Sequence, residues 1–214
     1  MPRIIETVVY TIDELTDRAR DAARRWYRSL GPHDAWDDDI IEDFAAICEI
    51  LGIALATRQV PLQGGRTREA LRVFWSGFSI QGDGASFEGR WAHARGSCKG
   101  IRAYAPKDAE LHRIADALHD VQRRNFFQLQ ATITQSGRYC HEYTMSMDIE
   151  RESPTWQPPT CGAQDAVAAA MRDLARWLHR QLEEAYDHLD SDTEIDEALS
   201  VNDFTFTADG TRFG

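Results

Sequence analysis

Phe127-Gln128-Leu129-Gln130-Ala131-Thr132-Ile133-Thr134 alternates apolar and polar side chains along its whole length. A second stretch, from Tyr143 to Ile149, alternates in the same way after the turn residues Ser136-Gly137. A period of two is typical of a β-strand with one buried face, so the two stretches predict a β-hairpin. Tyr143 is expected on the buried face, together with His141 two positions earlier.

Helical periodicity surrounds this hairpin. Thr11-Ile12-Asp13-Glu14 has the pattern of a capping box, which predicts the start of a first helix that ends at Gly31-Pro32. A second helix is expected from about Asp37 to Gly52, a third from Pro106, and the longest from Asp165 to about Asp187, because apolar residues recur there every three to four positions.

Further strands are expected at 53–62, 71–75 and 86–91, with a last short strand near 204–207. Strands in adjacent hairpins with helices grouped around them predict an α+β fold. We expect a single domain over residues 1–214, with an antiparallel or mixed β-sheet of about six strands packed against four or five helices.

The chain of 214 residues has 24 Lys and Arg against 35 Asp and Glu, a net charge of −11. This charge disfavours non-specific binding to nucleic acid or to an anionic membrane. The first residues, Met1 to Glu6, lack the apolar run of a signal peptide, and no stretch of eighteen apolar residues occurs. The sequence therefore predicts a cytosolic protein. Four irregularly spaced cysteines predict free thiols.

Acidic residues gather in two segments that contain no Lys or Arg, 33–43 and 183–209. The two segments hold sixteen acidic residues, which leaves the rest of the chain at +5. If the segments meet in space they form one negative surface for a basic partner, although a solvated acidic face is the more common outcome of such runs. The candidate partner-binding residues are Asp37, Asp38, Asp39, Glu42, Asp43, Glu183, Glu184, Asp187, Asp190, Asp192 and Glu194.

A glycine-rich segment, 76–89, offers a second candidate site. Glycine permits close approach of backbone N–H groups to a ligand, so the loop could bind a small molecule. Its candidate ligand-binding residues are Ser76, Gln81, Gly82, Asp83, Gly84 and Glu88. The alternative, which we favour, is a β-bulge or tight hairpin with Asp83-Gly84 as the turn.

An enzymatic function would use Asp83, Glu88 and His93 as acid and base, with His141 and Glu142 from the hairpin. No motif of a metalloprotease, an α/β-hydrolase or a zinc site is present. We therefore name no catalytic residue, no metal ligand and no cofactor, and a non-enzymatic function is favoured.

The segment Ser76-Gly77-Phe78-Ser79-Ile80-Gln81-Gly82-Asp83-Gly84-Ala85-Ser86-Phe87-Glu88-Gly89 resembles a family of small proteins encoded by phages and prophages. Some members are labelled antitoxins of toxin–antitoxin stability systems. Tyr10 to Thr16 and Ile41 to Phe44 share the resemblance, which runs along most of the chain. It implies an accessory phage protein in the cytosol of a bacterial host and assigns no catalytic residue.

Together, these features predict an acidic inhibitor, antitoxin-like or directed against host defence, that mimics nucleic acid. It would dock on a basic host or toxin protein, including one that itself binds nucleic acid. Neither nucleic acid nor a membrane is an expected direct partner. The alternatives are an enzyme or ligand sensor built on the glycine-rich segment, and a structural or assembly component of the virion.

Overall fold

The computed structural model describes residues 6–31, 35–62 and 64–214. Within these residues the fold is α+β, as predicted, with six α-helices, a four-stranded antiparallel main sheet and three separate two-stranded pairs. The main sheet is thus smaller than the six strands expected, and the helices are more numerous. The chain forms two compact units, which we call unit 1 (Met1–Trp36 and Glu183–Gly214) and unit 2 (Asp37–Leu182). That they fold as a single domain stays a prediction.

The main sheet of unit 2 has the order β1 (Ile53–Leu55), β6 (Gly89–Ala92), β7 (Leu129–Gln135), β8 (Met145–Arg151). Strands β7 and β8 are the predicted hairpin, with Ala131 opposite Ile149. Their alternation puts one set of side chains in the core and the other in solvent, as expected for a half-buried sheet.

The prediction that Tyr143 shares this buried face is wrong. A short 3-10 helix, η2 (Glu142–Thr144), precedes β8 and interrupts the alternation before Met145. Tyr143 is 68% exposed and its ring stacks on His141, with 5.4 Å between the centroids. The half-buried His141 is therefore no core histidine.

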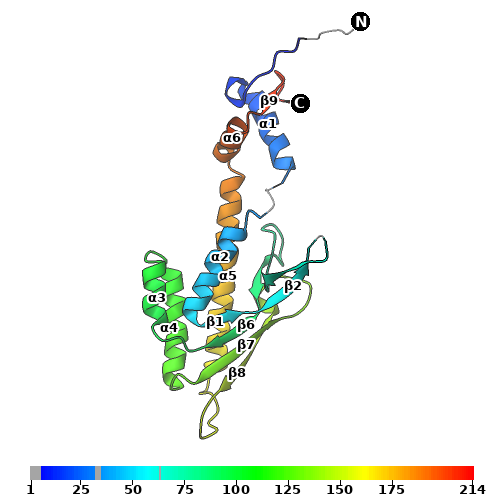
Figure 1. The fold of residues 1–214 in the computed structure, drawn as a ribbon. Helices are drawn as coiled ribbons and strands as arrows, with labels where there is room; N and C mark the ends of the chain where they lie inside the picture. The colour runs from blue at the N-terminus through cyan, green and yellow to red at the C-terminus, as the bar shows by residue number, and fades with distance from the viewer. Residues whose placement is uncertain (1–5, 32–34, 63) are drawn as a thin grey trace. The chain divides into compact units, whose positions relative to one another are not determined.

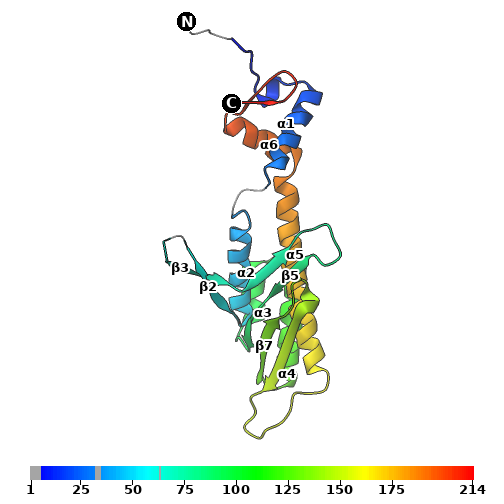
Figure 2. The same cartoon turned by 90° about the vertical axis from the view of Figure 1, so that its right-hand side faces the viewer.

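Unit 2 also contains four helices: α2 (Asp38–Leu51), α3 (Ser97–Tyr104), α4 (Ala109–Arg124) and α5 (Ala163–Leu189), whose last turns belong to unit 1 (Figures 1 and 2). Each helix has buried apolar side chains. The predicted α2, α4 and α5 are confirmed to within a few residues, although α4 begins after its cap Asp108 and not at Pro106. Gly52 ends α2 with φ +82°, and a Cβ there would lie 2.3 Å from the Ala92 carbonyl oxygen. Glycine is thus required where α2 turns into β1.

The strands predicted at 53–62 and 86–91 are each broken in two, and the strand predicted at 71–75 misses most of a further strand that begins at Thr67. Strand β1 continues into β2 (Thr57–Pro61), β3 (Thr67–Leu71) into β4 (Val73–Ser76), and β5 (Gly84–Phe87) into β6. The breaks at Ala56, Arg72 and Glu88 are joined by a ring of backbone hydrogen bonds: Ala56 N–H to Glu88 O, Glu88 N–H to Arg72 O, and Arg72 N–H to Ala56 O, at 2.7 to 2.9 Å. Each strand changes its partner at this junction, so β2 pairs with β3, β4 with β5 and β1 with β6.

Unit 1 is built from both ends of the chain. It contains a 3-10 helix η1 (Ile12–Glu14), α1 (Asp17–Ser29), the last turns of α5, α6 (Asp192–Val201), and the strands β9 (Thr205–Phe206) and β10 (Arg212–Phe213). Its core consists of Ile12, Leu15, Ala19, Ala23, Ile195, Leu199 and Phe206. The ring of Trp26 packs edge-on against Phe204 and Phe206.

The first helix begins later than predicted. The backbone N–H of Thr11 donates to the Glu14 carboxylate at 2.9 Å, so the predicted capping box forms. It caps the short helix η1, however, and not the main helix. Helix α1 starts one turn further on, where the Thr16 hydroxyl accepts from Ala19 N–H at 3.4 Å. The backbone is extended at Leu15 and Thr16, and this separates the two elements.

Among the described residues, no helix has both the length and the apolar composition that crossing a bilayer requires. All four cysteines are free thiols, as predicted.

Candidate functional site

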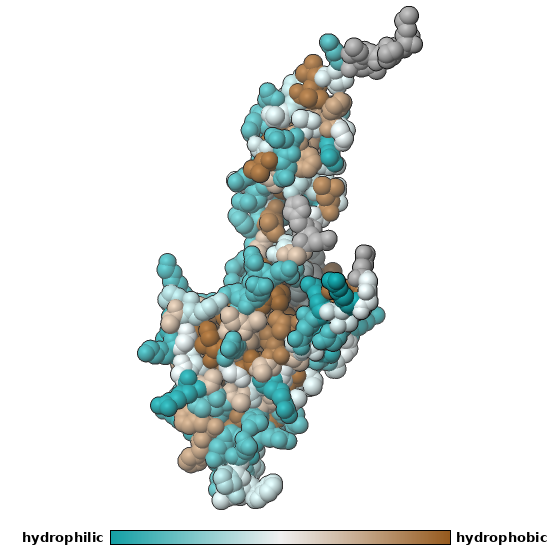
Figure 3. All heavy atoms as spheres, in the orientation of Figure 1, coloured by the Kyte–Doolittle hydropathy of each residue, from teal (hydrophilic) through white to brown (hydrophobic). Residues whose placement is uncertain are grey.

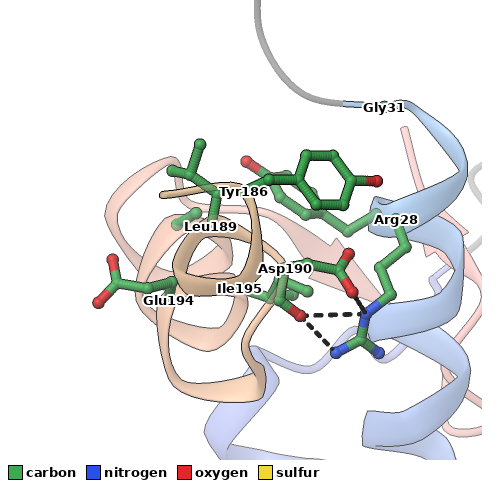
Figure 4. Close-up of a pocket in the computed structure, with 9 residues that line it drawn as sticks. Arg28, Gly31, Tyr186, Leu189, Asp190, Glu194 and Ile195 are labelled. Atoms are coloured by element: carbon green, nitrogen blue, oxygen red, sulfur yellow. Dashed lines mark hydrogen bonds and ion pairs between the residues drawn. The ribbon is translucent and has the colours of Figure 1, made fainter. Parts of the chain in front are cut away.

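A cavity of about 140 Å³ lies within unit 1, between α1, the end of α5 and α6 (Figure 4). Its apolar lining comes from two tyrosines and three aliphatic residues, and its charged lining from one arginine and two acids. The lining residues are Tyr27, Arg28, Gly31, Tyr186, Leu189, Asp190, Glu194, Ile195 and Ala198. The cavity is therefore lined by both apolar and charged side chains.

The turn between α5 and α6 fixes the carboxylates of this lining. The Asp190 N–H still bonds to the Tyr186 carbonyl at 2.9 Å, as the last turn of α5 ends. Ser191 then caps α6, because its hydroxyl accepts from the Glu194 N–H at 3.3 Å. Buried Ile195 holds the first turn of α6 in the core of unit 1. Asp190 and Glu194, which precede and follow the cap residue Ser191, thus both line the cavity.

Two arginines of α1 reach across to these acids. Arg28 donates to the Asp190 carbonyl at 2.8 Å and to the Asp192 carboxylate at 2.7 Å (Figure 4 shows its bonds to Asp190). Arg24 donates to Asp192 and Asp196, both at 2.8 Å. The hydrogen bond from Arg28, with the charge of Arg24, holds the pKa of Asp192 below its ordinary value. With Asp21 of α1, which lies 3.5 Å from Arg24, two guanidinium groups face four carboxylates, so the cluster keeps a negative charge.

The predicted acids of the second segment have three different environments. Asp190 and Glu194 line the cavity, and Glu194 also lies 3.4 Å from His188. Asp192 is bound by the two arginines. The remaining three, Glu183, Glu184 and Asp187, belong to the last turns of α5, where Glu183 is half-buried and the other two are exposed.

The predicted acids of the first segment belong to unit 2. Asp37 accepts a hydrogen bond from the Trp75 indole at 2.8 Å, and Asp43 accepts one from the Tyr104 hydroxyl at 2.5 Å. Three others, Asp38, Asp39 and Glu42, are exposed on the first turns of α2, and Asp34 lies outside the described residues. That the two acidic segments form one surface stays a prediction.

The two acidic residues of the glycine-rich segment bond to groups of the protein itself. The Asp83 carboxylate accepts from the N–H groups of Ser79 and Ile80 at 2.8 and 2.9 Å, and these bonds lower its pKa. Glu88 forms an ion pair with Arg72 at the strand junction and accepts from Gln135 N–H at 3.3 Å. Both carboxylates thus have structural partners.

The other candidate ligand residues also belong to this local structure. Ser76 ends β4, while Gln81 and Gly82 lie in the turn. Gly84 begins β5, and a Cβ there would lie 3.0 Å from the Cα of His141. The turn predicted at Asp83-Gly84 is therefore wrong by a few residues: Asp83 closes a turn formed by the residues before it.

Among the residues proposed for an enzyme, His141 and Glu142 lie together, with His141 Nδ1 3.0 Å from the Glu142 carboxylate. Glu142 is buried and pairs with Arg176 at 3.2 Å, while His93 packs on Phe127 with 4.5 Å between the ring centroids. Burial, and secondarily the charge of His119, lowers the pKa of His93. No group of three or more His, Cys, Asp or Glu in the described part of the chain is arranged to hold a metal ion.

Charge counting found Asp190 and Glu194 but missed the apolar cavity beside them. No helix is predicted from the sequence between about Asp187 and residue 204, although Ser191-Asp192-Thr193-Glu194 fits a capping box and Ile195 and Leu199 are spaced as on one helical face. These signals could have placed Ile195 in a core. Tyr27 and Ala198 line the same cavity although they are far apart in the sequence, so no local pattern could predict it.

A family model described as "Domain of unknown function (DUF8835)" matches residues 36–192. These bounds nearly coincide with unit 2 and the rest of α5. No curated protein and no solved structure matches the chain.

Proposed function

The chain belongs to the DUF8835 family, which assigns no activity, and from its own residues we propose that it is a protein-binding inhibitor that docks on a basic partner through unit 1. The observation that carries the proposal is the cavity of unit 1, because it places an apolar hollow beside carboxylates. Such a site fits a partner segment in which an apolar side chain stands next to Lys or Arg.

The volume of the cavity limits the size of the apolar side chain that a partner can insert. A cavity of about 150 Å³ accommodates a benzene-sized group. With about 140 Å³, this one suits a single aromatic ring or a branched aliphatic side chain. Interfaces often depend on one such buried side chain surrounded by weaker polar contacts.

The charge of unit 1 indicates the charge of the partner. Unit 1 holds seven arginines against sixteen acidic residues, a net charge of −9, whereas unit 2 holds 17 basic against 19 acidic residues, a net charge of −2. Arg24 and Arg28 offset part of the acid at α6, and exposed acids remain in the last turns of α5. This distribution attracts a basic protein and speeds its association at low salt.

The resemblance to phage-encoded proteins supports the finer part of the proposal. An accessory phage protein of this kind acts by occupying a host or toxin protein in stoichiometric amounts. Carboxylates then stand where the phosphates of nucleic acid would bind. The partner expected is a basic host or toxin protein, antitoxin-like inhibition or counter-defence being the outcome.

The test is affinity capture from host lysate with the full chain and two variants of α6. Ala198→Phe fills the cavity, while Val201→Phe puts the same ring on a side chain that is 74% exposed and outside the cavity. We expect the wild type and Val201→Phe to capture the same basic protein, and Ala198→Phe to lose it at least tenfold. Capture should weaken strongly between about 50 and 500 mM salt.

Two further measurements keep the test decisive. Circular dichroism and thermal melting check that each variant folds, and the smaller change Ala198→Leu replaces Ala198→Phe if the latter does not. Equal capture by folded Ala198→Phe and wild type, or capture that does not change with salt, would contradict docking at this site.

A further inference from the structure

The β2–β3 hairpin of unit 2 has no role in the proposed docking site. Its strands, Thr57–Pro61 and Thr67–Leu71, pair only with each other within the described residues. Most of their residues are exposed, so neither face of the ribbon is covered. In Figures 1 and 2 the hairpin projects from the body of unit 2, and Figure 3 shows hydrophilic side chains along it.

The register of the hairpin separates its charges by face. Arg58 lies opposite Ala70, and Arg68 lies opposite Val60. Because side chains opposite each other in an antiparallel pair share a face, both arginines are on one side, and Arg66, two positions before Arg68, joins them. The acid of the hairpin, Glu69, is on the other face, where it accepts a hydrogen bond from Thr57 at 2.6 Å.

The arginine face has no internal counter-charge. Arg58, Arg66 and Arg68 are exposed, and no ion pair in the described part of the chain includes them. Like charges on neighbouring strands destabilise a sheet by mutual repulsion. An external polyanion would relieve this repulsion, and the apolar residues beside the arginines, Val60 and Leu62, would add contact area.

From this arrangement we infer that the hairpin binds the major groove of duplex DNA, with Arg58, Arg66 and Arg68 contacting phosphates or base edges. The major groove is about 12 Å wide and admits a two-stranded β-ribbon. Alternate residues on one strand are about 6.8 Å apart, which corresponds to two steps of about 3.4 Å between phosphates along the DNA axis. Arginine also bonds bidentately to phosphate and to guanine.

Duplex DNA is favoured over an acidic protein segment because of the shape of the hairpin. A ribbon that is solvated on both faces and projects from the body can enter a groove. Its projection also holds the rest of unit 2 away from the phosphates. The overall charge still opposes binding, so affinity is expected to be modest and confined to low salt. The inference does not depend on the docking site of unit 1.

The test is fluorescence anisotropy of a labelled 20-base-pair duplex with the full chain across a salt series. Three phosphate contacts predict a slope of log K against log salt of about −3. The variant Arg58→Gln/Arg66→Gln/Arg68→Gln should weaken binding more than tenfold, and Arg68→Gln alone should reduce the slope by about one. The change Ala198→Phe should leave DNA binding unchanged, which separates this result from the test of the docking site.

A matched variant controls for total charge. Lys99→Gln/Lys107→Gln/Arg138→Gln removes the same three charges from exposed positions outside the hairpin. We expect it to bind like the wild type within about twofold. No DNA binding by the wild type at low salt, or equal loss in both triple variants, would overturn the inference. Tighter binding of single-stranded DNA or of polyglutamate than of the duplex would overturn it as well.

Discussion

His93 shows how packing changes the chemistry of one side chain. Its ring lies against Phe127, which lies in turn against His119 with 5.6 Å between the centroids. The backbone of Phe127 has φ +59°, a left-handed conformation that is rare outside glycine. Next to it, the buried Asn125 holds Val121 and Thr160 through its side-chain amide. The histidines are thus packed against a ring that the fold fixes in place.

The lowered pKa of His93 predicts a pH dependence of stability. The unfolded chain binds a proton on this residue below about pH 6.5, while the folded state still resists protonation. The contribution of His93 to stability is therefore complete above about pH 6.5 and is lost as the pH falls toward the lower folded pKa. Urea unfolding between about pH 5 and 8 measures it.

The variant His93→Gln should reduce the fall in unfolding free energy between about pH 6.5 and 5. His188→Gln, at a side chain that is 69% exposed, serves as the control and should keep the slope of the wild type. Carboxylates with lowered pKa, such as Asp83 and Glu88, lose their contribution at more acidic pH and do not interfere. An unchanged slope in His93→Gln contradicts the prediction.

At the scale of elements, the sequence predicted what depends on local periodicity. The stripes of α2, α4 and α5 and the alternation of β7 and β8 are visible in any window of ten to twenty residues. The strand breaks at Ala56, Arg72 and Glu88 are not, because each exists only through hydrogen bonds to the other two strands. Likewise, no local pattern shows that Arg24 and Arg28 would bind acids of α6 more than 160 positions later.

Helix α6 offers a prediction at this scale. Removing its cap by Ser191→Ala leaves the Glu194 N–H without its acceptor and should lower the unfolding free energy by about 0.5–2 kcal/mol. Ser191→Asp, which can still accept that hydrogen bond, should retain most of the stability. Chemical denaturation measures both. Equal stability of Ser191→Ala and the wild type would show that the cap contributes nothing to α6.

For the whole molecule, the family domain and the acidic unit overlap without sharing a boundary. The family match at 36–192 covers unit 2, while most of the acidic unit 1 lies outside it. Residues 183–192 of the match hold five of the sixteen acidic residues of unit 1, so the other eleven lie outside the family domain. Counting charges along the sequence identified the acidic ends, but the cavity that gives them an apolar neighbour appears only once α1 and α6 are packed together.

Each unit has its own buried core, and this predicts which elements a core substitution destabilises. Leu199 is fully buried in the core of unit 1, and Ile133 is buried in the main sheet of unit 2. Leu199→Ala should cost about 2–5 kcal/mol. Amide hydrogen exchange should then speed up in α1 and α6 while β7 and β8 keep their protection. Ile133→Ala should give the opposite pattern. Equal loss of protection in both units, for either variant, would show that the chain unfolds as one cooperative domain, because a single core would then carry the stability of all its elements.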